Sequence, residues 1–431
     1  MKREPAELLK DLVRINTTNP PGGEAKLLTL LEDIFNKEEI AFVRQETAPG
    51  RGNLLAWLPA AKENAGPPLV LLSHVDVVGA QAEQWRLPPF EAQEEDGYIY
   101  GRGTVDTKQL TVMELAAFLA LKEAGGSLSR PVVFLATSDE ESGSTYGLQW
   151  FLEHPVTAGG RTFYGRELFT DSDVISEGGG FPIRIGEKEF YLCESGQKGC
   201  GVVEFTVKAR KAKGPFFGSG DGMERAMGLV EDIGKRELPG TVLETVRRFE
   251  EKLAGAALSS GMERIRTAMK HNTMTVTMVS GKNVNEVKVT CDVRLLPGFD
   301  REWLEGILHD LCARWDCEYR IISLGQGYES RAEGGLAAIL EEATKEALEG
   351  TGTEAELLPF VSMGSSDGRL LVDTGARVYG YSPVLSWDMT FDSAVAMVHG
   401  INERIHRDSL AFGCRVLTLA VGRAVREEEE R

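Results

Sequence analysis

Residues 69–80 read LVLLSHVDVVGA, so a short apolar run passes directly into His74 and Asp76. An apolar run of this length is consistent with a buried strand. Because successive side chains of a strand point to opposite faces, His74 and Asp76 fall on the same face. The stretch therefore predicts a buried strand whose end carries two titratable groups.

The same arrangement recurs along the first half of the chain. The segment PVVFLATSDEESGS (131–144) places Glu140 and Glu141 after an apolar strand, and DVISEGGG (173–180) places Glu177 after another. Before them, TVMELAAFLALKEAG (111–125) has apolar residues at helical spacing and stops at a Gly-Gly pair. Strands that alternate with helices predict an α/β fold, in which sites lie at the carboxyl ends of the strands.

The pattern changes after about Gln197. The next segments are predicted as strand, helix, strand, strand, helix and strand, over residues 201–209, 223–234, 272–281, 285–298, 300–315 and 318–325. This order predicts an α+β two-layer sandwich with the split βαβ arrangement. Helix and strand alternate again from about Gly335. We therefore predict an α/β catalytic domain of residues 1–197 and 328–431, with a mostly parallel sheet flanked by helices, and an inserted sandwich of residues 198–327.

Composition narrows the possible functions. The chain has 431 residues, with 48 Lys plus Arg against 66 Asp plus Glu and a formal net charge of −18. This charge argues against non-specific binding to nucleic acid or to an anionic membrane. No run reaches the roughly 18 apolar residues of a membrane-spanning helix, and the start lacks the features of a secretory signal. We expect a cytoplasmic protein whose six scattered cysteines are free thiols.

Acidic and imidazole groups at several predicted strand ends indicate a metal site. Besides the ends already named, GRGTVDTK (101–108) places Asp106 after a Gly-Arg-Gly turn. Carboxylates at one sheet edge repel one another unless a cation neutralises them. Imidazole and oxygen ligands without thiolates favour zinc, with manganese or cobalt as substitutes. Asp76 could orient the His74 imidazole by accepting its other N–H.

The chain resembles the dinuclear zinc aminoacylase and carboxypeptidase family, which includes glutamate carboxypeptidase, acetylornithine deacetylase, succinyl-diaminopimelate desuccinylase and dipeptidases. The resemblance is carried by the ordered motifs HVD (74–76), GRGTVDTK (101–108), TSDEESGS (137–144), SEGGG (176–180), SSDGR (365–369) and VHGINERI (398–405). It implies a metal-dependent hydrolase that cleaves an amide or peptide bond of a small N-acyl amino acid or short peptide. Two divalent ions are implied as cofactors.

The resemblance also implies a role for each metal ligand. His74 and Glu177 would bind one ion, Glu141 and His399 would bind the other, and Asp106 would bridge both. His406 competes with His399 for the last position, because both lie on one predicted helix about two turns apart. The run HGINE (399–403) reproduces the family pattern and favours His399.

Two further acids have implied catalytic roles. Glu140 would be the general base that takes a proton from the metal-activated water, and Asp76 would support His74. The residue type at position 140 fits this role independently, because a carboxylate beside the metals that is not itself a ligand can relay a proton to the leaving amine.

Substrate-binding residues are less sharply indicated. Arg294 matches the arginine that holds a substrate carboxylate in relatives, a role suited to bidentate pairing, although an ordinary ion pair is a competing interpretation. Arg369 in SSDGR is a second candidate. In the altered hairpin GKNVNEVKV (281–289), Asn283 or Asn285 is the amide candidate for the substrate site.

One family motif is missing. Relatives carry Gly-His-x-Ser soon after the first strand of the insertion, and its histidine stabilises the oxyanion, but residues 208–226 contain no histidine. Losing one oxyanion donor typically costs about 100- to 1,000-fold in turnover. Another group such as His271, from this chain or a partner chain, could replace it. Otherwise the substrate needs less help, or the protein is a metal-binding homologue that has lost hydrolysis and acts as a binding or regulatory protein.

The inserted sandwich is expected to act as a lid over the substrate. By analogy with relatives it would also provide the surface of a homodimer.

Overall fold

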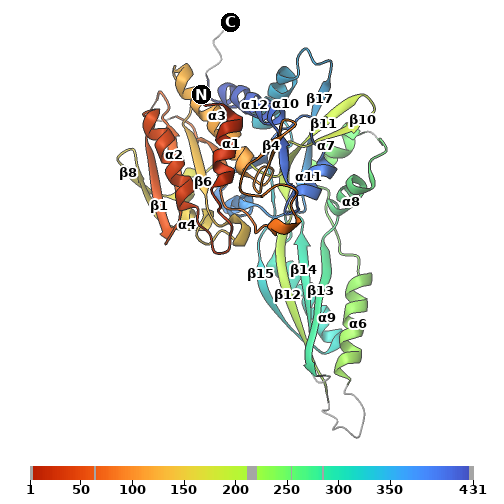
Figure 1. Ribbon diagram of the computed structural model, residues 1–431. Coiled ribbons are helices and arrows are strands. Elements are labelled where there is room, and N and C mark those ends of the chain that lie inside the picture. Colours follow the sequence, from red (N-terminus) through yellow and green to blue (C-terminus); the bar gives the residue numbers. More distant parts are fainter. Residues whose placement is uncertain (1–2, 63–64, 211–220, 254, 284–285, 427–431) are drawn as a thin grey trace.

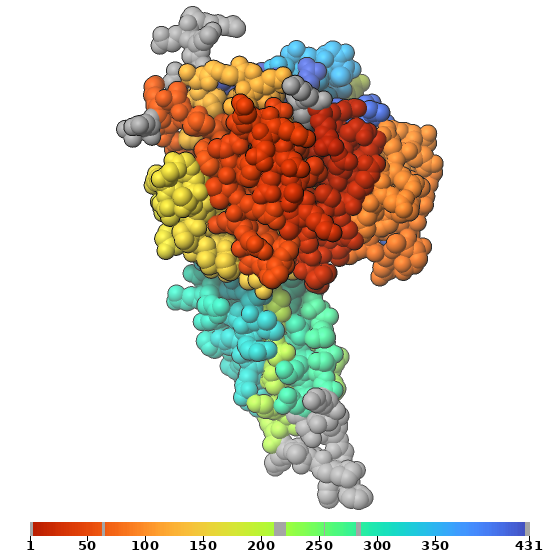
Figure 2. All heavy atoms as spheres, turned by 60° about the vertical axis from the view of Figure 1, so that its left-hand side comes forward, coloured from red at the N-terminus to blue at the C-terminus, as the bar shows by residue number. Residues whose placement is uncertain are grey.

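The computed structural model describes residues 3–62, 65–210, 221–253, 255–283 and 286–426. A broad body contains most of the chain, and a narrow one, made by strands β12 to β15 with α6 and α9, projects from it (Figure 1). A space-filling view shows the same projection below the N-terminal part of the chain (Figure 2). The predicted fold class, an α/β catalytic domain with an inserted α+β sandwich, is confirmed.

The broad body is built on one ten-stranded sheet. Its path is β1 (Phe42–Ala48), β2 (Arg51–Leu58), β6 (Val132–Thr137), β3 (Leu69–His74), β9 (Asp173–Ser176), β18 (Arg377–Gly380), β11 (Lys188–Gln197) and β10 (Pro182–Ile185). Strands β16 (Tyr328–Glu329) and β17 (Glu354–Ser362) also pair with β11.

The sheet is mixed, and its parallel part is central. Strands β6, β3, β9 and β18 are parallel neighbours, whereas β1, β2 and β10 pair antiparallel at the two ends. The mostly parallel arrangement predicted from the sequence describes the centre of the sheet but not its two ends, where hairpins form. These hairpins turn over two residues, with Gly50 at φ 78° and Gly186 at φ 63°. Tight turns of this kind join antiparallel strands, whereas parallel strands need a long crossover.

Helices cover both faces of the sheet, which explains the continuous apolar sequence of its central strands. In β3, Leu69 and Leu71 pack in one core cluster, and Val70 and Leu72 pack in another on the opposite face. The first face is covered by α1 (Pro5–Arg14), α2 (Ala25–Lys37), α3 (Lys108–Ala124), α10 (Gly335–Ala347) and α12 (Arg407–Val425). The second is covered by α4 (Leu148–Glu153), with α5 (Gly165–Leu168) and η3 (Asp367–Thr374) beside it.

Short elements complete the body. They are η1 (Ala82–Gln84), β4 (Glu94–Glu95), β5 (Tyr98–Tyr100), η2 (Glu140–Ser142), β7 (Pro155–Ala158), β8 (Arg161–Tyr164), α11 (Phe391–Met397) and β19 (Arg404–His406). Within the described ranges, no helix combines the length and the apolar character needed to cross a bilayer. The cytoplasmic location expected from the sequence stays a prediction.

The projecting sandwich has the predicted order of elements. They are β12 (Gly199–Lys208), α6 (Gly222–Lys235), β13 (Thr273–Asn283), β14 (Glu286–Leu295), α9 (Arg301–Trp315) and β15 (Glu318–Leu324). The strands form an antiparallel sheet in the order β13-β14-β12-β15. Alternate residues of β14, such as Val289 and Cys291, pack against Leu308 of α9 and Leu229 of α6. The period-two pattern of the sequence therefore matches one buried and one more exposed face.

Two helices between α6 and β13 were not identified from the sequence. They are α7 (Glu244–Leu253) and α8 (Ser260–Ala268), and both lie beside the broad body, away from the sandwich (Figure 1). Val246, Phe249 and Leu253 of α7 are buried in the core cluster that also contains Leu357 of β17. The predicted insertion, residues 198–327, thus contains a segment that packs on the catalytic domain. The spacing of these three apolar residues, i, i+3 and i+7, was the available signal.

The ion pair between α7 and α8 predicts a pH dependence controlled by Glu250. Its carboxylate accepts hydrogen bonds from Arg266 Nε at 2.8 and 3.0 Å. These bonds, aided by Lys270, lower the pKa of Glu250 from 4.5 to about 2. A lowered folded-state pKa stabilises the fold above the unfolded value, and this stabilisation is lost as the pH falls from about 4.5 toward 2.

We therefore expect Glu250→Gln to lower the opening free energy of α7 and α8 by roughly 0.2–1 kcal/mol at pH 7, and by less as the pH falls below 4.5. Hydrogen exchange over residues 244–268 measures this difference. Glu342→Gln, at an exposed position of α10, is the matched control. An equal effect of Glu250→Gln at pH 7 and pH 3 would contradict the expectation.

Candidate metal centre

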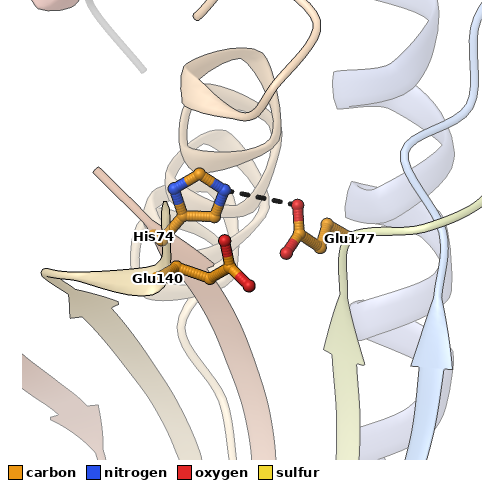
Figure 3. Close-up of side chains that lie close together, drawn as sticks. All are labelled: His74, Glu140 and Glu177. Atoms are coloured by element: carbon orange, nitrogen blue, oxygen red, sulfur yellow. Dashed lines mark ion pairs between the residues drawn. The ribbon is translucent and has the colours of Figure 1, made fainter. Parts of the chain in front are cut away.

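The ends of three central strands bring the first residues of the site together. His74 is the last residue of β3 and lies opposite Thr137, the last residue of the parallel strand β6. Glu140 follows β6, and Glu177 follows β9 directly. Figure 3 shows His74, Glu140 and Glu177 pointing toward one another from these strand ends. His74 Nε2 lies 3.3 Å from Glu177 Oε2.

Asp106 lies between two histidines. His74 Nε2 is 3.3 Å from Asp106 Oδ1, and His399 Nε2 is 3.1 Å from Asp106 Oδ2. His399 Nε2 is also 3.1 Å from Glu141 Oε2. The structure therefore brings all five expected ligands together, with one oxygen of Asp106 facing each imidazole. This arrangement supports the bridging role that the resemblance implied for Asp106.

The charges of the cluster fit divalent cations. Although burial disfavours the imidazolium, Glu177 and Asp106 raise the pKa of His74 well above its usual value. Hydrogen bonds with Asp106 and Glu141 raise the pKa of His399 to about 10. The carboxylates thus favour a positive charge at this position. Divalent ions would supply that charge while leaving the imidazoles neutral, which is the form that binds metal.

The surroundings of Glu140 disfavour its ionisation. Burial first, and the neighbouring charge of Glu177 second, raise its pKa well above the usual value. Its Oε1 lies 3.5 Å from Arg369 Nη1. One ligand atom from each of Glu140, His74 and Glu177 lie within 4.8 Å of one another. Glu140 is therefore placed either to exchange a proton at the centre or to act as a further ligand.

Asp76 supports more of the site than its histidine. The Nδ1–H of His74 donates to the backbone carbonyl of Asp76 at 3.0 Å, and Asp76 Oδ1 is 3.5 Å from the same nitrogen. This leaves Nε2 facing the other carboxylates. The Asp76 carboxylate accepts the backbone N–H groups of Glu140 at 3.1 Å and Glu141 at 3.2 Å, and the side chain of Asn19 at 2.8 Å. Asp76 therefore positions both His74 and the acidic turn after β6.

A buried acid that the sequence analysis missed holds Asp106 in place. The Glu403 carboxylate is fully buried and accepts the backbone N–H groups of Gly103 at 3.1 Å, Val105 at 2.6 Å and Asp106 at 3.0 Å. Arg102 Nη1 donates to it at 2.7 Å. Glu403 belongs to the run HGINE, which was used only for its histidine. Its place in that run, four residues after His399, was the available signal.

The predicted helix containing both His399 and His406 is wrong. Helix α11 ends at Met397, and His399 lies in the following turn at φ 57°. His406 ends β19 and packs edge-on against Tyr98, with ring centroids 5.0 Å apart. The turn directs His399 to Asp106, whereas His406 belongs to a small separate sheet.

In the structure, two of the residues predicted to bind substrate are hydrogen-bonded to other groups of the protein. Arg294 donates to Asp292 through Nε at 2.9 Å and Nη2 at 3.0 Å, and through Nη1 to the Met363 carbonyl at 3.0 Å. Arg369 donates to the Ser366 carbonyl at 2.7 Å in addition to its contact with Glu140.

The remaining candidates do not join the metal centre. Asn285 lies outside the described residues, and so does the side chain of Asn283. His271 lies at a separate surface hollow with Val242 and Glu250, outside the cavity at the metal centre, so replacement of the missing histidine by His271 of the same chain is not supported.

A cavity of about 480 Å³ opens onto the cluster. Asp106, Glu140, Glu141, Glu177 and His399 all line it, so a small molecule that enters it meets the whole set of acids. Cavities of this size are typical of small-molecule sites.

Comparisons with known proteins concern the family and the fold of the chain. The family model described as Peptidase family M20/M25/M40 matches residues 70–423. Aminoacylase-1 of Mus musculus is 22% identical over 429 residues, which cover 95% of this chain and 93% of that protein. The M20 family metallo-carboxypeptidase Sso-CP2 from Sulfolobus solfataricus has a similar fold, with a TM-score of 0.72, 18% identity and coverage of 97% of this chain and 98% of that chain. The di-peptidase Dug1p from Saccharomyces cerevisiae has a TM-score of 0.64 and 16% identity, and covers 96% and 94%.

Glu403→Ala tests whether this buried acid positions Asp106. The change leaves Arg102 and three backbone N–H groups without their acceptor, so we expect a loss of roughly 3–5 kcal/mol in the free energy of unfolding. We also expect weaker metal binding, measured as metal per chain after gel filtration. Glu349→Ala, at an exposed position after α10, is the control and should change neither quantity. If Glu403→Ala does not fold, Glu403→Gln is measured instead, and normal metal affinity in a folded variant would contradict the positioning role.

Proposed function

The chain belongs to peptidase family M20/M25/M40, a family of metallopeptidases and aminoacylases, and on that premise we propose that it hydrolyses an amide bond of a small N-acyl amino acid or short peptide at two divalent metal ions. The observation that carries this proposal is the placing of Asp106 between His74 and His399 at 3.3 and 3.1 Å. A shared carboxylate between two imidazoles is a suitable bridge for a pair of ions.

The proposed metal ligands form two sets that share one residue. His74 and Glu177 would hold one ion, Glu141 and His399 would hold the other, and Asp106 would hold both. Oxygen and imidazole ligands support zinc, with cobalt or manganese as substitutes. When bound, such a pair of ions lowers the pKa of a water molecule and polarises the carbonyl of the amide.

The chain's own residues would then move the proton. Glu140 accepts a proton from the attacking water and returns it to the leaving amine. Its burial and the charge of Glu177 raise its pKa, so the carboxylate is a stronger base than an exposed glutamate. Arg369 stays at Glu140 Oε1 and keeps the carboxylate oriented, and Asp76 holds the backbone of the same turn.

Substrate binding is proposed to involve both domains. Arg294, on the sandwich strand β14, would bind a substrate carboxylate by exchanging its present partner Asp292. Asn285 stays a candidate on the same hairpin. The sandwich would close over the substrate as a lid, and a homodimer would form through the sandwich.

A second candidate function is a metal-binding regulator without hydrolysis. The absence of a histidine from residues 208–226 favours it, because the family's oxyanion donor is then missing. The two functions differ in whether the metal-loaded protein hydrolyses a substrate: the enzyme does, and the regulator does not.

Glu140→Gln separates a general base from a metal ligand. If Glu140 relays protons, the variant should lose about 100- to 10,000-fold in kcat on N-acetyl amino acids and dipeptides. Its metal content should stay equal to that of the wild type, as measured by mass spectrometry of the loaded protein. Glu342→Gln is the exposed control. Loss of a metal ion from Glu140→Gln would instead make Glu140 a ligand, and no turnover by the wild type over the whole panel would favour the regulator.

Removal of metal should cost both activity and stability. A ligand present at 100 times its dissociation constant adds about 2.7 kcal/mol to the free energy of unfolding. Dialysis against a chelator should therefore lower the melting temperature of the catalytic domain and abolish turnover, and added zinc should restore both. A melting temperature that does not respond to chelator or to zinc would contradict the proposed site, whatever the activity.

A further inference from the structure

We infer that the substrate group entering the cavity beside the metal centre is apolar and uncharged, and that α8 and α11 select it. The inference rests on the proposed function, because it names the substrate class of the same site.

One wall of the cavity is apolar and is assembled from separate parts of the chain. Ile265 comes from α8, Phe360 from β17, Phe391 and Val395 from α11, and Val398 from the turn after α11. The rings of Phe360 and Phe391 pack edge to face with centroids 6.0 Å apart. An aliphatic or aromatic group can therefore contact several side chains at once, next to His399.

Helices α8 and α11 form this wall as a unit. A Cβ atom on Gly261 of α8 would lie 2.7 Å from Asp392 Oδ1 of α11, so the two helices are in direct contact. Val395 and Val398 are 58% and 37% exposed although both line the cavity. A substrate that covers them removes apolar surface from water, which stabilises the complex by roughly 25 cal/mol per Å².

An acidic group would find no partner at this wall. Within the part of the chain that the structure describes, neither arginine nor lysine lines the cavity. Of the nearby cations, Lys198 Nζ donates to the carbonyls of Ala268 and His271, and Arg294, now paired with Asp292, is assigned to the carboxylate that every such substrate carries. A further carboxylate buried against this apolar wall would therefore be desolvated without a partner.

A cationic group would find no free carboxylate beyond the metal centre. Glu194 lines the cavity, but its Oε1 accepts hydrogen bonds from Tyr328 at 2.7 Å and from Gln197 at 3.3 Å. Burial also raises the pKa of Glu194 to about 8, which favours the neutral acid. The other acids that line the cavity are those assigned to the metals and the proposed general base Glu140.

Gln197 offers a neutral anchor for the substrate amide. It is 1% exposed, and its Nε2 donates to Ser366 Oγ at 3.0 Å. Among the described residues that line the cavity, its Oε1 is the buried side-chain oxygen without a hydrogen-bond partner. An unsatisfied buried acceptor costs about 1–3 kcal/mol, so a donor from the ligand fits here. The N–H of an amide substrate provides that donor without adding charge.

Two pairs of substrates test the inference on both sides of the scissile bond. N-acetyl-leucine and N-acetyl-aspartate differ on the amine side, and N-hexanoyl-alanine and N-succinyl-alanine differ on the acyl side. In at least one pair we expect kcat/KM of the apolar substrate to be higher by roughly 100-fold or more, because the charged one must be buried without a partner.

Val395→Arg places a cation in the wall at an exposed position that tolerates a long side chain. In the pair for which the wild type prefers the apolar substrate, this variant should lower the ratio of kcat/KM for the apolar substrate to kcat/KM for the charged one at least tenfold. Val242→Arg is the matched control, because Val242 is 80% exposed and lies at the hollow outside this cavity. The inference is overturned if the wild type prefers the charged substrate in both pairs. It is also overturned if the ratio of kcat/KM between the apolar and the charged substrate is the same in the wild type and in Val395→Arg.

Binding to the metal-loaded Glu140→Gln variant separates this inference from the proposed function. Calorimetry should show N-acetyl-leucine or N-hexanoyl-alanine binding at least tenfold tighter than its charged counterpart. If the wild type hydrolyses nothing but this preference is present, the proposed function fails and the inference stands. If the wild type hydrolyses the charged substrates better, the inference fails and the function stands.

Discussion

Repulsion among carboxylates at one edge of the central sheet is the constraint on which this structure depends. Asp106, Glu141 and Glu177 are drawn together around two imidazoles, and like charges this close raise the pKa of Glu177 in addition to its burial. Hydrogen bonds from backbone N–H groups hold the supporting acids Asp76 and Glu403. Because cations relieve the repulsion, metal binding should contribute directly to the stability of this edge.

Much of this centre could be predicted because it follows from local sequence. A buried parallel strand is a continuous apolar run, and the residues at or just after its end lie at the edge of the sheet. This rule located His74, Glu140 and Glu177. Glu403 was missed because a buried acid held by backbone N–H groups leaves no periodic pattern, and only its place in the run HGINE pointed to it. The turn that presents His399 at φ 57° likewise depends on tertiary contacts, so helical spacing was a misleading guide there.

The path of the chain links the sandwich to the cavity. The chain enters the sandwich at β12, leaves it after α6 to pack α7 and α8 on the catalytic domain, and returns at β13 (Figure 1). Lys198 stabilises this junction by donating to the carbonyls of Ala268, the last residue of α8, and of His271, three residues later. The proposed lid is therefore connected to the wall that carries Ile265. Its movement over the substrate would act on the apolar side of the cavity as well as on Arg294.

The path of the chain also shows which metal centre a histidine in the sandwich could reach, a residue that segment 208–226 lacks. Strand β12 runs away from the broad body and α6 runs back toward it, so the end of β12 and the start of α6 lie at the far end of the sandwich (Figure 1). A side chain at either of these two described ends could serve a metal centre only through a large movement of the sandwich or in a second copy of the chain. In the proposed homodimer, the absence of a histidine from residues 208–226 would therefore affect oxyanion stabilisation across the dimer and leave the metal centre of each chain complete.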